Sequence, residues 1–529
     1  MMALVSVMGT KADVIPSNYY SEPAAGKYYI YNVTEGKFLR TAGVSENNYS
    51  LLDAPVAVTL TAKGETVCKG GGDYILSGND NCFIKIGQYK GQWLWSDAAS
   101  GNADILAWTF NSNGTKTYTM SITLSEAFSQ NGSILDVGTH YMKDVTNLGT
   151  EAEAGTYALI TEANYYNYLA STTATIPASY YTTTPVAGTY YLYSPYANCF
   201  VYDGNNYVAL GNTPEALTIT ANGDNFDIQL KDGKYMKYGE HSLGNTWADG
   251  NTSDPWAFET FHGATGLFFL KNVGQSSYLY AFSTEAATKG AQLWGTAETN
   301  NTRYAWALIS EANYTAWQNS FNLSDANTVG FSTLKDIYNV NPTVSRAMTA
   351  NVWNTLVVPF DMEIPSDWTV KEPTSFSGGT LTFGDASSIV AGKPYLVMPT
   401  SDVPNFSATG VTLKKGLDPT SVSEGALTMT GTYTKIDAVP EGSYVLGTDN
   451  KLYKVNSTVS LKPFRAYFTI AGEAPARISL AFDDEITGIN DAQRSMLDAQ
   501  SYYNLQGQRV SQLKKGLFIK NGKKFIIKY

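Results

Sequence analysis

The sequence predicts an all-β protein of several modules, and three observations lead to this prediction. The chain has 529 residues, which is more than one hydrophobic core usually organises. Aromatic residues make up 13% of the chain, with 37 tyrosines, and aromatic side chains fit the pleated surface of a sheet. Only 16% of the residues are charged, whereas coiled coils and disordered acidic chains need many more charges.

The charge is distributed unevenly along the chain. The formal net charge is −11, and because a negative surface repels phosphates we expect no nucleic-acid partner. Residues 500–529 contain seven basic and no acidic residues, so the first 499 residues carry −18. The body of the protein is therefore acidic, and its C-terminal end is basic.

The first 315 residues contain an internal repeat. Three segments recur in the same order, which indicates two homologous modules of roughly 140 residues each. Within each module short alternating strands, separated by Gly, Asn and Asp turns, repeat about every 45 residues. Three four-stranded units that close into a barrel would leave no exposed sheet edge. The recurring segments are 23–31 and 185–193, 54–64 and 213–223, and 157–165 and 306–314.

The two modules resemble the ricin-type β-trefoil. Residues 290–294 (GAQLW) form a Q-x-W element that is followed by Trp306, and residues 92–95 (QWLW) form a weaker one. The resemblance implies that the tryptophan of this element lies mainly in the core, so the motif indicates the fold more than a ligand. An unclosed β-sandwich is the alternative architecture for each module.

The trefoil resemblance also suggests where a sugar would bind. Trefoils of this kind often use one carboxylate and one aromatic ring per lobe, because sugar hydroxyls need charged acceptors and the sugar's C–H face stacks on a ring. Two Trp-x-Asp pairs occupy matching places in the modules, each followed by a second tryptophan, Trp108 or Trp256. The alternative is that these tryptophans lie in the core and the aspartates form turns. The candidate carbohydrate-binding residues are Trp95, Asp97, Trp247, Asp249, Tyr202, Asp203 and Asp136.

The second half of the chain has a different pattern. After a polar stretch with one short helix, apolar runs bounded by Pro or Gly predict an antiparallel β-sandwich. The order of the motifs at 353–356 (WNTL), 392–397 (GKPYLV) and 462–468 (KPFRAYF) resembles a module common in secreted and surface proteins of Bacteroidota. Arg465 is flanked by apolar residues, and we expect it to pair with an acid rather than to bind a ligand.

The two ends of the chain suggest where the protein is located. Met1 to Met8 form an apolar run with a small-residue cleavage site after Ala12, as at the end of a secretory signal peptide; an ordinary apolar terminus is the alternative. Residues 502–524 predict a hairpin around Asn521-Gly522 and resemble the C-terminal sorting segment of secreted Bacteroidota proteins; a solvated basic hairpin is the alternative. No window approaches about 18 uninterrupted apolar residues, so we expect no membrane span.

These observations together predict two tandem β-trefoils, an antiparallel β-sandwich and a short C-terminal β-hairpin segment. The expected domains are 1–22, a remnant signal peptide and leader; 23–165, the first trefoil; 166–182, a linker; 183–315, the second trefoil; 316–345, a linker with a short helix; 346–487, the sandwich; and 488–529, a segment of the sorting or anchoring type.

The sequence carries no familiar catalytic signature. Phosphate-binding loops, the nucleophile elbow and zinc-ligand spacings are missing, so we expect no catalytic residue, metal or cofactor. The favoured function is a secreted or cell-surface, non-catalytic protein whose trefoils bind a host or dietary glycan or polysaccharide. The alternatives are a structural or adhesive surface protein with a protein partner, and a glycoside hydrolase with its acids among Asp361, Asp385 and Glu441.

Overall fold

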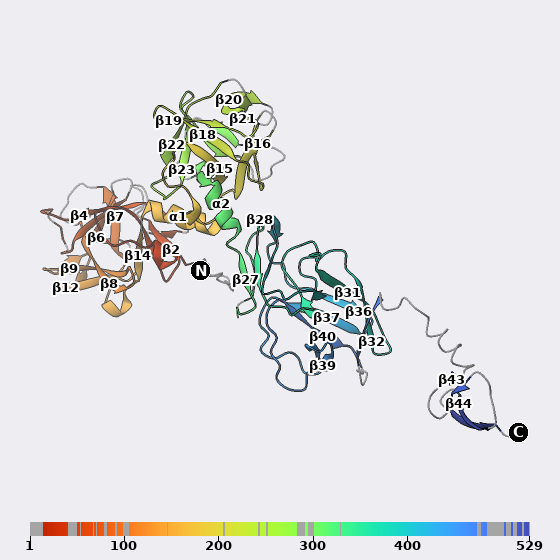
Figure 1. Ribbon diagram of the computed structural model, residues 1–529. Coiled ribbons are helices and arrows are strands. Elements are labelled where there is room, and N and C mark those ends of the chain that lie inside the picture. Colours follow the sequence, from red (N-terminus) through yellow and green to blue (C-terminus); the bar gives the residue numbers. More distant parts are fainter. Residues whose placement is uncertain are drawn as a thin grey trace. The chain divides into compact units, whose positions relative to one another are not determined.

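The computed structural model describes most of the chain, which divides into two compact units, one ending at Trp317 and one beginning at Gln318 (Figure 1). The predicted cleavage site after Ala12 lies outside the described residues. These are 14–40, 50–52, 54–66, 68–69, 71–78, 82–89, 92–98, 105–144, 147–204, 207–241, 244–249, 252–282, 291–294, 301–327, 330–472, 478–483, 502–503, 509–510, 516–520 and 523–527.

The first module contains a closed ring of six antiparallel strands. Successive ring strands pair with one another, and the last strand pairs with the first, so the ring has no free edge. The ring strands are β1 (Gly26–Asn32), β4 (Val58–Ala62), β5 (Tyr74–Gly78), β8 (Ala107–Gly114), β9 (Thr117–Leu124) and β14 (Tyr157–Ile160). The hairpin strands are β2 (Lys37–Arg40) with β3 (Ser50–Leu52), β6 (Cys82–Tyr89) with β7 (Gln92–Ala98), β10 (Phe128–Gln130) with β11 (Ser133–Leu135), and β12 (Gly138–Met142) with β13 (Leu148–Gly149).

The second module repeats this ring. An isolated bridge between Phe268 and Trp306 joins the fifth ring strand to the sixth, which pairs with the first. The ring strands are β15 (Gly188–Ser194), β18 (Leu217–Asn222), β19 (Asn225–Gln229), β22 (Trp256–Thr260), β23 (Phe268–Asn272) and β26 (Ala307–Ser310). Each of the three lobes adds one hairpin: β16 (Cys199–Asp203) with β17 (Val208–Gly211), β20 (Tyr235–His241) with β21 (Gly244–Asp249), and β24 (Ser277–Ala281) with β25 (Ala291–Trp294).

The three-lobed rings confirm the β-trefoil prediction and exclude the unclosed sandwich for these modules. Apolar side chains fill each ring, and Trp108, Trp256 and Trp306 are fully buried there. Two of these indoles also donate a hydrogen bond to the backbone: Trp256 Nε1 to the Met236 oxygen at 2.8 Å, and Trp306 Nε1 to the Leu279 oxygen at 2.9 Å. The core therefore holds the second tryptophans of both Trp-x-Asp segments.

A short helix follows the last strand of each trefoil. Thr161 caps α1 (Glu162–Thr173), and Ser310 precedes α2 (Glu311–Gln318) and accepts a hydrogen bond from the Asn313 amide in the same way. The Asn164 and Asn313 side chains each donate to a tyrosine carbonyl, at 2.9 Å to Tyr19 and at 3.0 Å to Tyr180. Those tyrosines end the 3-10 helices η1 (Ser17–Tyr19) and η4 (Ala178–Tyr180), and the described part also contains the 3-10 helices η3 (Glu151–Glu153) and η5 (Thr302–Tyr304).

The packed part of each trefoil thus begins earlier than the repeated strand motif. Ile15 and Tyr20 are buried, and the Tyr20 hydroxyl donates to the Ile15 oxygen at 2.6 Å. Ile176 and Tyr181 repeat this bond at 2.8 Å. The segments before residues 23 and 183, which we expected to be leader and linker, therefore pack against their trefoils: Ile15 and Tyr20 join an apolar cluster with Tyr31, and the Tyr181 ring contacts Tyr193.

The helix α1 contacts both trefoils. Its Tyr165 ring packs edge-on against Tyr29 of the first trefoil, with ring centroids 5.2 Å apart. Tyr166 stacks on His262 of the second trefoil at 4.5 Å, and the Glu162 carboxylate lies 3.1 Å from the His262 ring nitrogen Nδ1. Neither helix in the described part of the chain has the length and apolar character that a membrane span requires.

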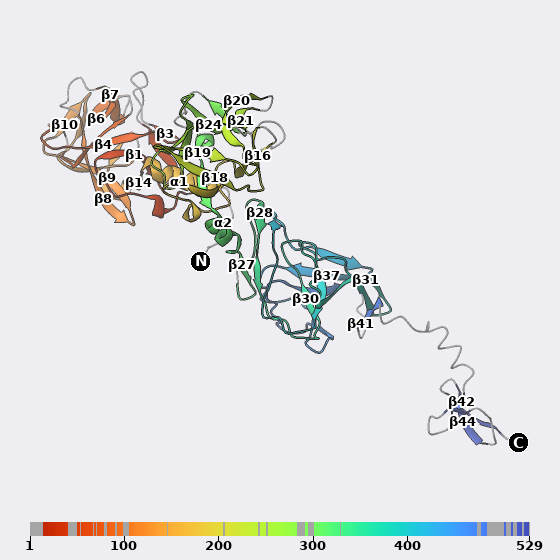
Figure 2. The same ribbon diagram turned by 45° about the horizontal axis from the view of Figure 1, so that its top comes forward.

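The second unit is a sandwich of two five-stranded sheets, as predicted (Figure 2). Leu381, Phe383, Leu427, Met429 and Phe468 form part of the core between the sheets. One sheet has the order β30 (Asn354–Leu356), β33 (Tyr395–Pro399), β31 (Trp368–Ser377), β32 (Thr380–Asp385), β41 (Ser479–Phe482). The other has the order β36 (Ser421–Glu424), β37 (Leu427–Thr432), β40 (Arg465–Ile470), β38 (Tyr444–Leu446), β39 (Leu452–Lys454).

Two features of the second unit were not expected. The pairs β32–β41 and β27–β29 are parallel, and part of 316–345, expected to be a linker, forms strands. The additional strands are β27 (Asn322–Ser324), β29 (Thr343–Ser345) and β34 (Phe406–Ser407) in one small sheet, and β28 (Ile337–Val340) with β35 (Val411–Leu413) in another.

The C-terminal segment contains the predicted hairpin. Lys520 pairs with Lys523 across β44 and β45, and the residues between them, Asn521 and Gly522, lie outside the described part. The four strands of this sheet are β42 (Tyr502–Tyr503), β43 (Arg509–Val510), β44 (Gly516–Lys520) and β45 (Lys523–Ile527).

The buried tryptophans give a test of the trefoil core. We expect Trp306→Ala to lower the free energy of opening of β23 and β26 by about 3–5 kcal/mol, the usual cost of removing a buried aromatic side chain. Hydrogen exchange of the backbone amides in the full chain measures this, with β37 and β40 as an internal reference in the other unit. Unchanged exchange in β23 and β26, or equal losses in both units, would contradict it.

Candidate functional site

A pocket of about 470 Å³ lies beside the β16–β17 hairpin of the second trefoil. We call it the Tyr202 pocket. Its rim is partly exposed to solvent, because Asn212, Thr213 and Lys231 are exposed and Tyr202 and Glu215 are half-buried. Its lining residues are Tyr202, Gly211, Asn212, Thr213, Pro214, Glu215 and Lys231.

The hairpin register sets the position of the Tyr202 ring. Phe200 pairs with Gly211 across the two strands, and Tyr202 pairs with Ala209. A Cβ atom built on Gly211 would lie only 2.9 Å from Cε1 of Tyr202, so the ring occupies space that a side chain at position 211 would need. Glycine at 211 therefore allows the tyrosine ring to form one wall of the pocket.

Charged groups converge beside this ring. The Asp203 amide donates to Glu215 Oε1 at 3.2 Å, which connects the end of β16 to the segment before β18. The Asp203 carboxylate pairs with Lys234 Nζ at 3.2 Å, and Lys234 also pairs with Asp232. The Asp203 amide thus holds the Glu215 carboxylate in place at the pocket. The Asp203 carboxylate itself is paired with Lys234.

The electrostatics of the pocket favour neutral polar ligands with many hydroxyl groups. Burial, together with the nearby Tyr207 and Glu215, raises the pKa of Tyr202, so its hydroxyl stays protonated and can both donate and accept at neutral pH. Glu215 supplies carboxylate acceptors and Lys231 supplies ammonium donors. The Tyr202 ring adds an apolar face beside these groups.

The first trefoil has different residues at the corresponding positions. Phe38 pairs with Leu52 as Phe200 pairs with Gly211, so the two hairpins align by strand register. This alignment places Arg40 where the second trefoil has Tyr202, and the repeated Pro55 and Pro214 align Val56 with Glu215. The Tyr and Glu that line the Tyr202 pocket are therefore not repeated in the sequence of the first trefoil.

The repeated Trp-x-Asp pairs lie at equivalent places in the two folds. Strand β7 pairs Trp95 with Lys85, and β21 pairs Trp247 with Lys237, so both tryptophans belong to the hairpin of the second lobe. The backbone of Trp95, Asp97, Trp247 and Asp249 is placed, whereas their side chains lie outside the described part, and their role in binding stays a prediction.

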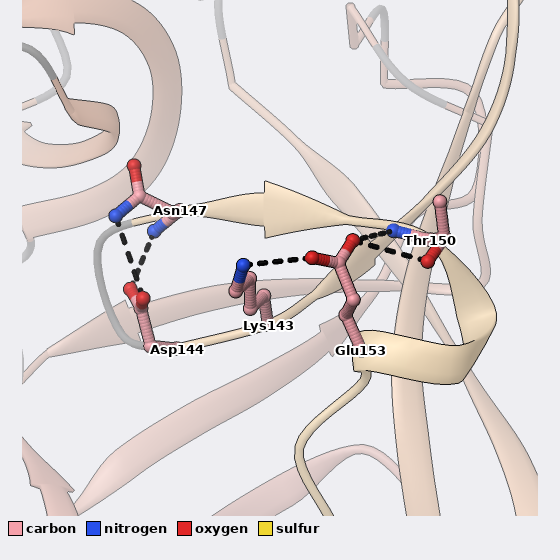
Figure 3. Close-up of polar contacts among 5 residues, drawn as sticks. All are labelled: Lys143, Asp144, Asn147, Thr150 and Glu153. Atoms are coloured by element: carbon pink, nitrogen blue, oxygen red, sulfur yellow. Dashed lines mark hydrogen bonds and ion pairs between the residues drawn. The ribbon is translucent and has the colours of Figure 1, made fainter.

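Asp136 is exposed in the third lobe of the first trefoil, and its backbone oxygen lies 2.8 Å from His140 Nε2. Nearby carboxylates support local turns (Figure 3). Glu153 accepts from Lys143 Nζ at 2.8 Å and from the amide and hydroxyl of Thr150 at 3.0 Å. Asp144 accepts from the Asn147 amide at 2.8 Å. These two acids therefore stabilise the β12–β13 connection and η3.

The acids considered for a hydrolase are found in separate settings in the sandwich. Asp361 lines a cavity of about 820 Å³ together with Glu363, and its Oδ1 accepts from the Ala391 amide at 2.7 Å. Asp385 pairs with Lys371 at 3.0 Å, and Glu441 is exposed in the turn before β38. Sequence reasoning did not single out Glu363.

Arg465 pairs with an acid, as expected. Its Nη2 lies 2.8 Å from Asp325 Oδ2. Among the described residues, no three His, Cys, Asp or Glu side chains converge in a way that could hold a metal ion.

Comparisons with known proteins give distant similarities. No family model and no curated protein matches the chain. A Culex salivary protein is 18% identical, over 25% of this chain and 98% of that chain, with a TM-score of 0.22. A ricin B-like lectin from Macrolepiota procera, solved with lactose, is 16% identical over 24% and 99%, with a TM-score of 0.22. An endo-β-galactosidase from Clostridium perfringens is 12% identical over 54% and 68%, with a TM-score of 0.20. These similarities are too distant to support a functional argument. The functional argument rests on the Tyr202 pocket instead.

The lysine that joins Asp203 and Asp232 gives a pH-dependent prediction. The hydrogen bond from Lys234 is the main reason why the pKa of Asp232 is lowered from 3.8 to about 2. This carboxylate therefore contributes stability above its ordinary pKa, and the contribution is lost as the pH falls through about 2. In Lys234→Met we expect the pKa of Asp232 to rise towards 3.8, measured by NMR titration of the carboxyl carbon. Lys271→Met, which removes the lysine paired with Glu259, should leave the titration of Asp232 unchanged, and equal effects would contradict the assignment.

Proposed function

We propose that the second trefoil is a non-catalytic carbohydrate-binding module and that the Tyr202 pocket holds a sugar ring. The observation that supports this is the arrangement of an aromatic ring beside a carboxylate and a lysine around a solvent-open cavity. A sugar presents hydroxyl groups on its edge and C–H groups on its face. Glu215 and Lys231 offer partners for the edge, and the Tyr202 ring offers an apolar surface for the face.

The proposed setting is a secreted or cell-surface protein that binds a host or dietary glycan. The apolar run before Ala12 and the likeness of 502–524 to sorting segments of Bacteroidota support this setting. Further sugar sites at Trp95–Asp97 and Trp247–Asp249 would make binding multivalent, which raises avidity without a new type of contact.

Substitutions in the pocket test the proposal. We expect Tyr202→Ala and Glu215→Gln each to weaken glycan binding of the full chain about tenfold or more, because truncating an anchor side chain or losing a hydrogen bond to a charged group each costs about 2 kcal/mol. A glycan array identifies the ligand, and calorimetry with that glycan measures the loss. Circular dichroism confirms that the variants remain folded.

Another Tyr–Glu–Lys cluster of the same trefoil provides a matched control. Tyr278 donates to Glu259 at 3.0 Å, and Glu259 also pairs with Lys271. Tyr278→Ala and Glu259→Gln should leave glycan binding unchanged. Loss of binding in the controls but not in the pocket variants would place the sugar elsewhere.

The same assays distinguish the other functions. The adhesive protein would be favoured if the array showed no bound glycan and the full chain captured a protein through residues of the second unit. Release of reducing sugar from a polysaccharide, lost in Asp361→Asn, would favour the hydrolase.

A further inference from the structure

A buried arginine and an aspartate lie side by side where a small sheet meets the sandwich. Strands β27 and β29 run parallel with Ser324 opposite Ser345, so the residues that follow them, Asp325 and Arg346, are neighbours. The Asp325 amide donates to the Ser345 oxygen at 3.1 Å, which continues the pairing by one residue. The strand register alone therefore places an acid and a base at this corner of the second unit.

Arg346 is 2% exposed, and its guanidinium is incompletely used. Its Nη1 donates to the Phe464 oxygen at 2.5 Å, whereas its Nε has no hydrogen-bond partner among the described residues. Nε and Nη2 form the side of a guanidinium that binds a carboxylate through two parallel hydrogen bonds. A buried N–H without an acceptor is costly, so Nε of Arg346 needs an acceptor that the described protein atoms do not supply.

A cavity lies beside Arg346. It has a volume of about 230 Å³ and is lined by both Arg346 and Arg465, with Asn354, Thr355 and Thr448 among its polar residues. Its volume is several times the roughly 30 Å³ of one water, yet below the roughly 300–1,000 Å³ of pockets that enclose drug-sized ligands. The cavity therefore suits a small organic molecule or a single charged group of a larger one.

Among the described residues, the charges around the cavity leave one arginine without an ion pair. Arg465 pairs with Asp325 at 2.8 Å, and no described carboxylate lies within ion-pair distance of Arg346. The Lys462 ammonium lies 3.8 Å from Asp325, but its side chain is 62% exposed and its charge is hydrated. Burial, with Arg465 close by, lowers the pKa of Arg346 well below its ordinary value, and the nearby Asp325 counteracts only part of this cost of burying a positive charge. A ligand with a single negative charge would offset it.

The backbone at the cavity is strained. Phe464 is buried and has a φ of 62°, a conformation that bulky residues rarely adopt. Its carbonyl accepts from Arg346 Nη1, and the adjacent Arg465 bonds to the Pro463 oxygen at 3.0 Å and to Asp325. The strained residue thus connects the two arginines and fixes the orientation of the first.

We propose that this cavity binds a small organic carboxylate, through the Nε–Nη2 side of Arg346. A carboxylate carries one negative charge and two oxygens spaced to match that side, whereas a phosphate carries more charge than the single unpaired arginine compensates. The carboxylate belongs either to an acidic sugar or to the C-terminus of a peptide. The site is separate from the Tyr202 pocket and does not depend on sugar binding there.

The test uses the full chain with Tyr202→Ala, so that the trefoil pocket does not contribute. Sodium galacturonate represents the acidic sugar, N-acetylglycine represents the peptide terminus, and galactose and inorganic phosphate serve as neutral and dianionic comparisons. We expect at least one carboxylate to bind more tightly than both comparisons in calorimetry. Arg346→Met, which keeps the volume but removes the charge, should weaken it at least tenfold.

A second variant guards against misfolding of Arg346→Met. Thr448 is exposed at the cavity, so Thr448→Trp should fill the opening without disturbing the fold, and it should also weaken the carboxylate at least tenfold. Binding of galacturonate alone or of N-acetylglycine alone supports the site and identifies its source. Equal binding of galactose, tighter binding of phosphate, unchanged affinity in both variants, or the absence of carboxylate binding would overturn the proposal.

Discussion

Each trefoil depends on the pairing of its first strand with its last. Tyr29 pairs with Ile160 and Tyr191 pairs with Ile309, so segments far apart in sequence close each six-stranded ring. Closure satisfies the edge hydrogen bonds and encloses an apolar core, which neither an open sheet nor a single lobe could do. Because the ring carries the stability, the hairpins that project from it are free to differ. The Tyr202 pocket lies on such a hairpin.

The fold could be predicted because the sequences of the strands that close each ring are repeated in the two modules. The tyrosine-rich first strands and the segments that end in Thr161 and Ser310 recur in order, so the rings were visible in the sequence. The small strands β27 and β29 could not be predicted in the same way, because three residues are too few to show alternation. Their pairing comes from tertiary contacts with the sandwich rather than from local pattern.

The candidate site was predicted only in part, because the residues that repeat between the two modules are mainly core residues rather than residues of the site. Trp108 and Trp256 repeat because both fill a ring, and both are fully buried. Tyr202 and Asp203 were found by their proximity in sequence, but Glu215 lies 12 residues from Asp203 and reaches it only through the β16–β17 hairpin. A difference between the modules could have indicated the site, because the second trefoil has the half-buried Glu215 where the first trefoil has the aliphatic Val56.

The same reasoning separates Arg346 from the charges that fold the sandwich. Lys371 is also buried, but it pairs with Asp385 at 3.0 Å, so its charge is compensated within the protein. Replacing a buried charge by a well-packed apolar side chain is often neutral or stabilising, so stability does not explain an arginine at 346. Nor does an ion pair explain it, since Asp325 is bonded to Arg465. What distinguishes Arg346 is a buried N–H without a described acceptor on a side chain that lines a cavity, and we attribute the missing acceptor to a molecule that enters that cavity.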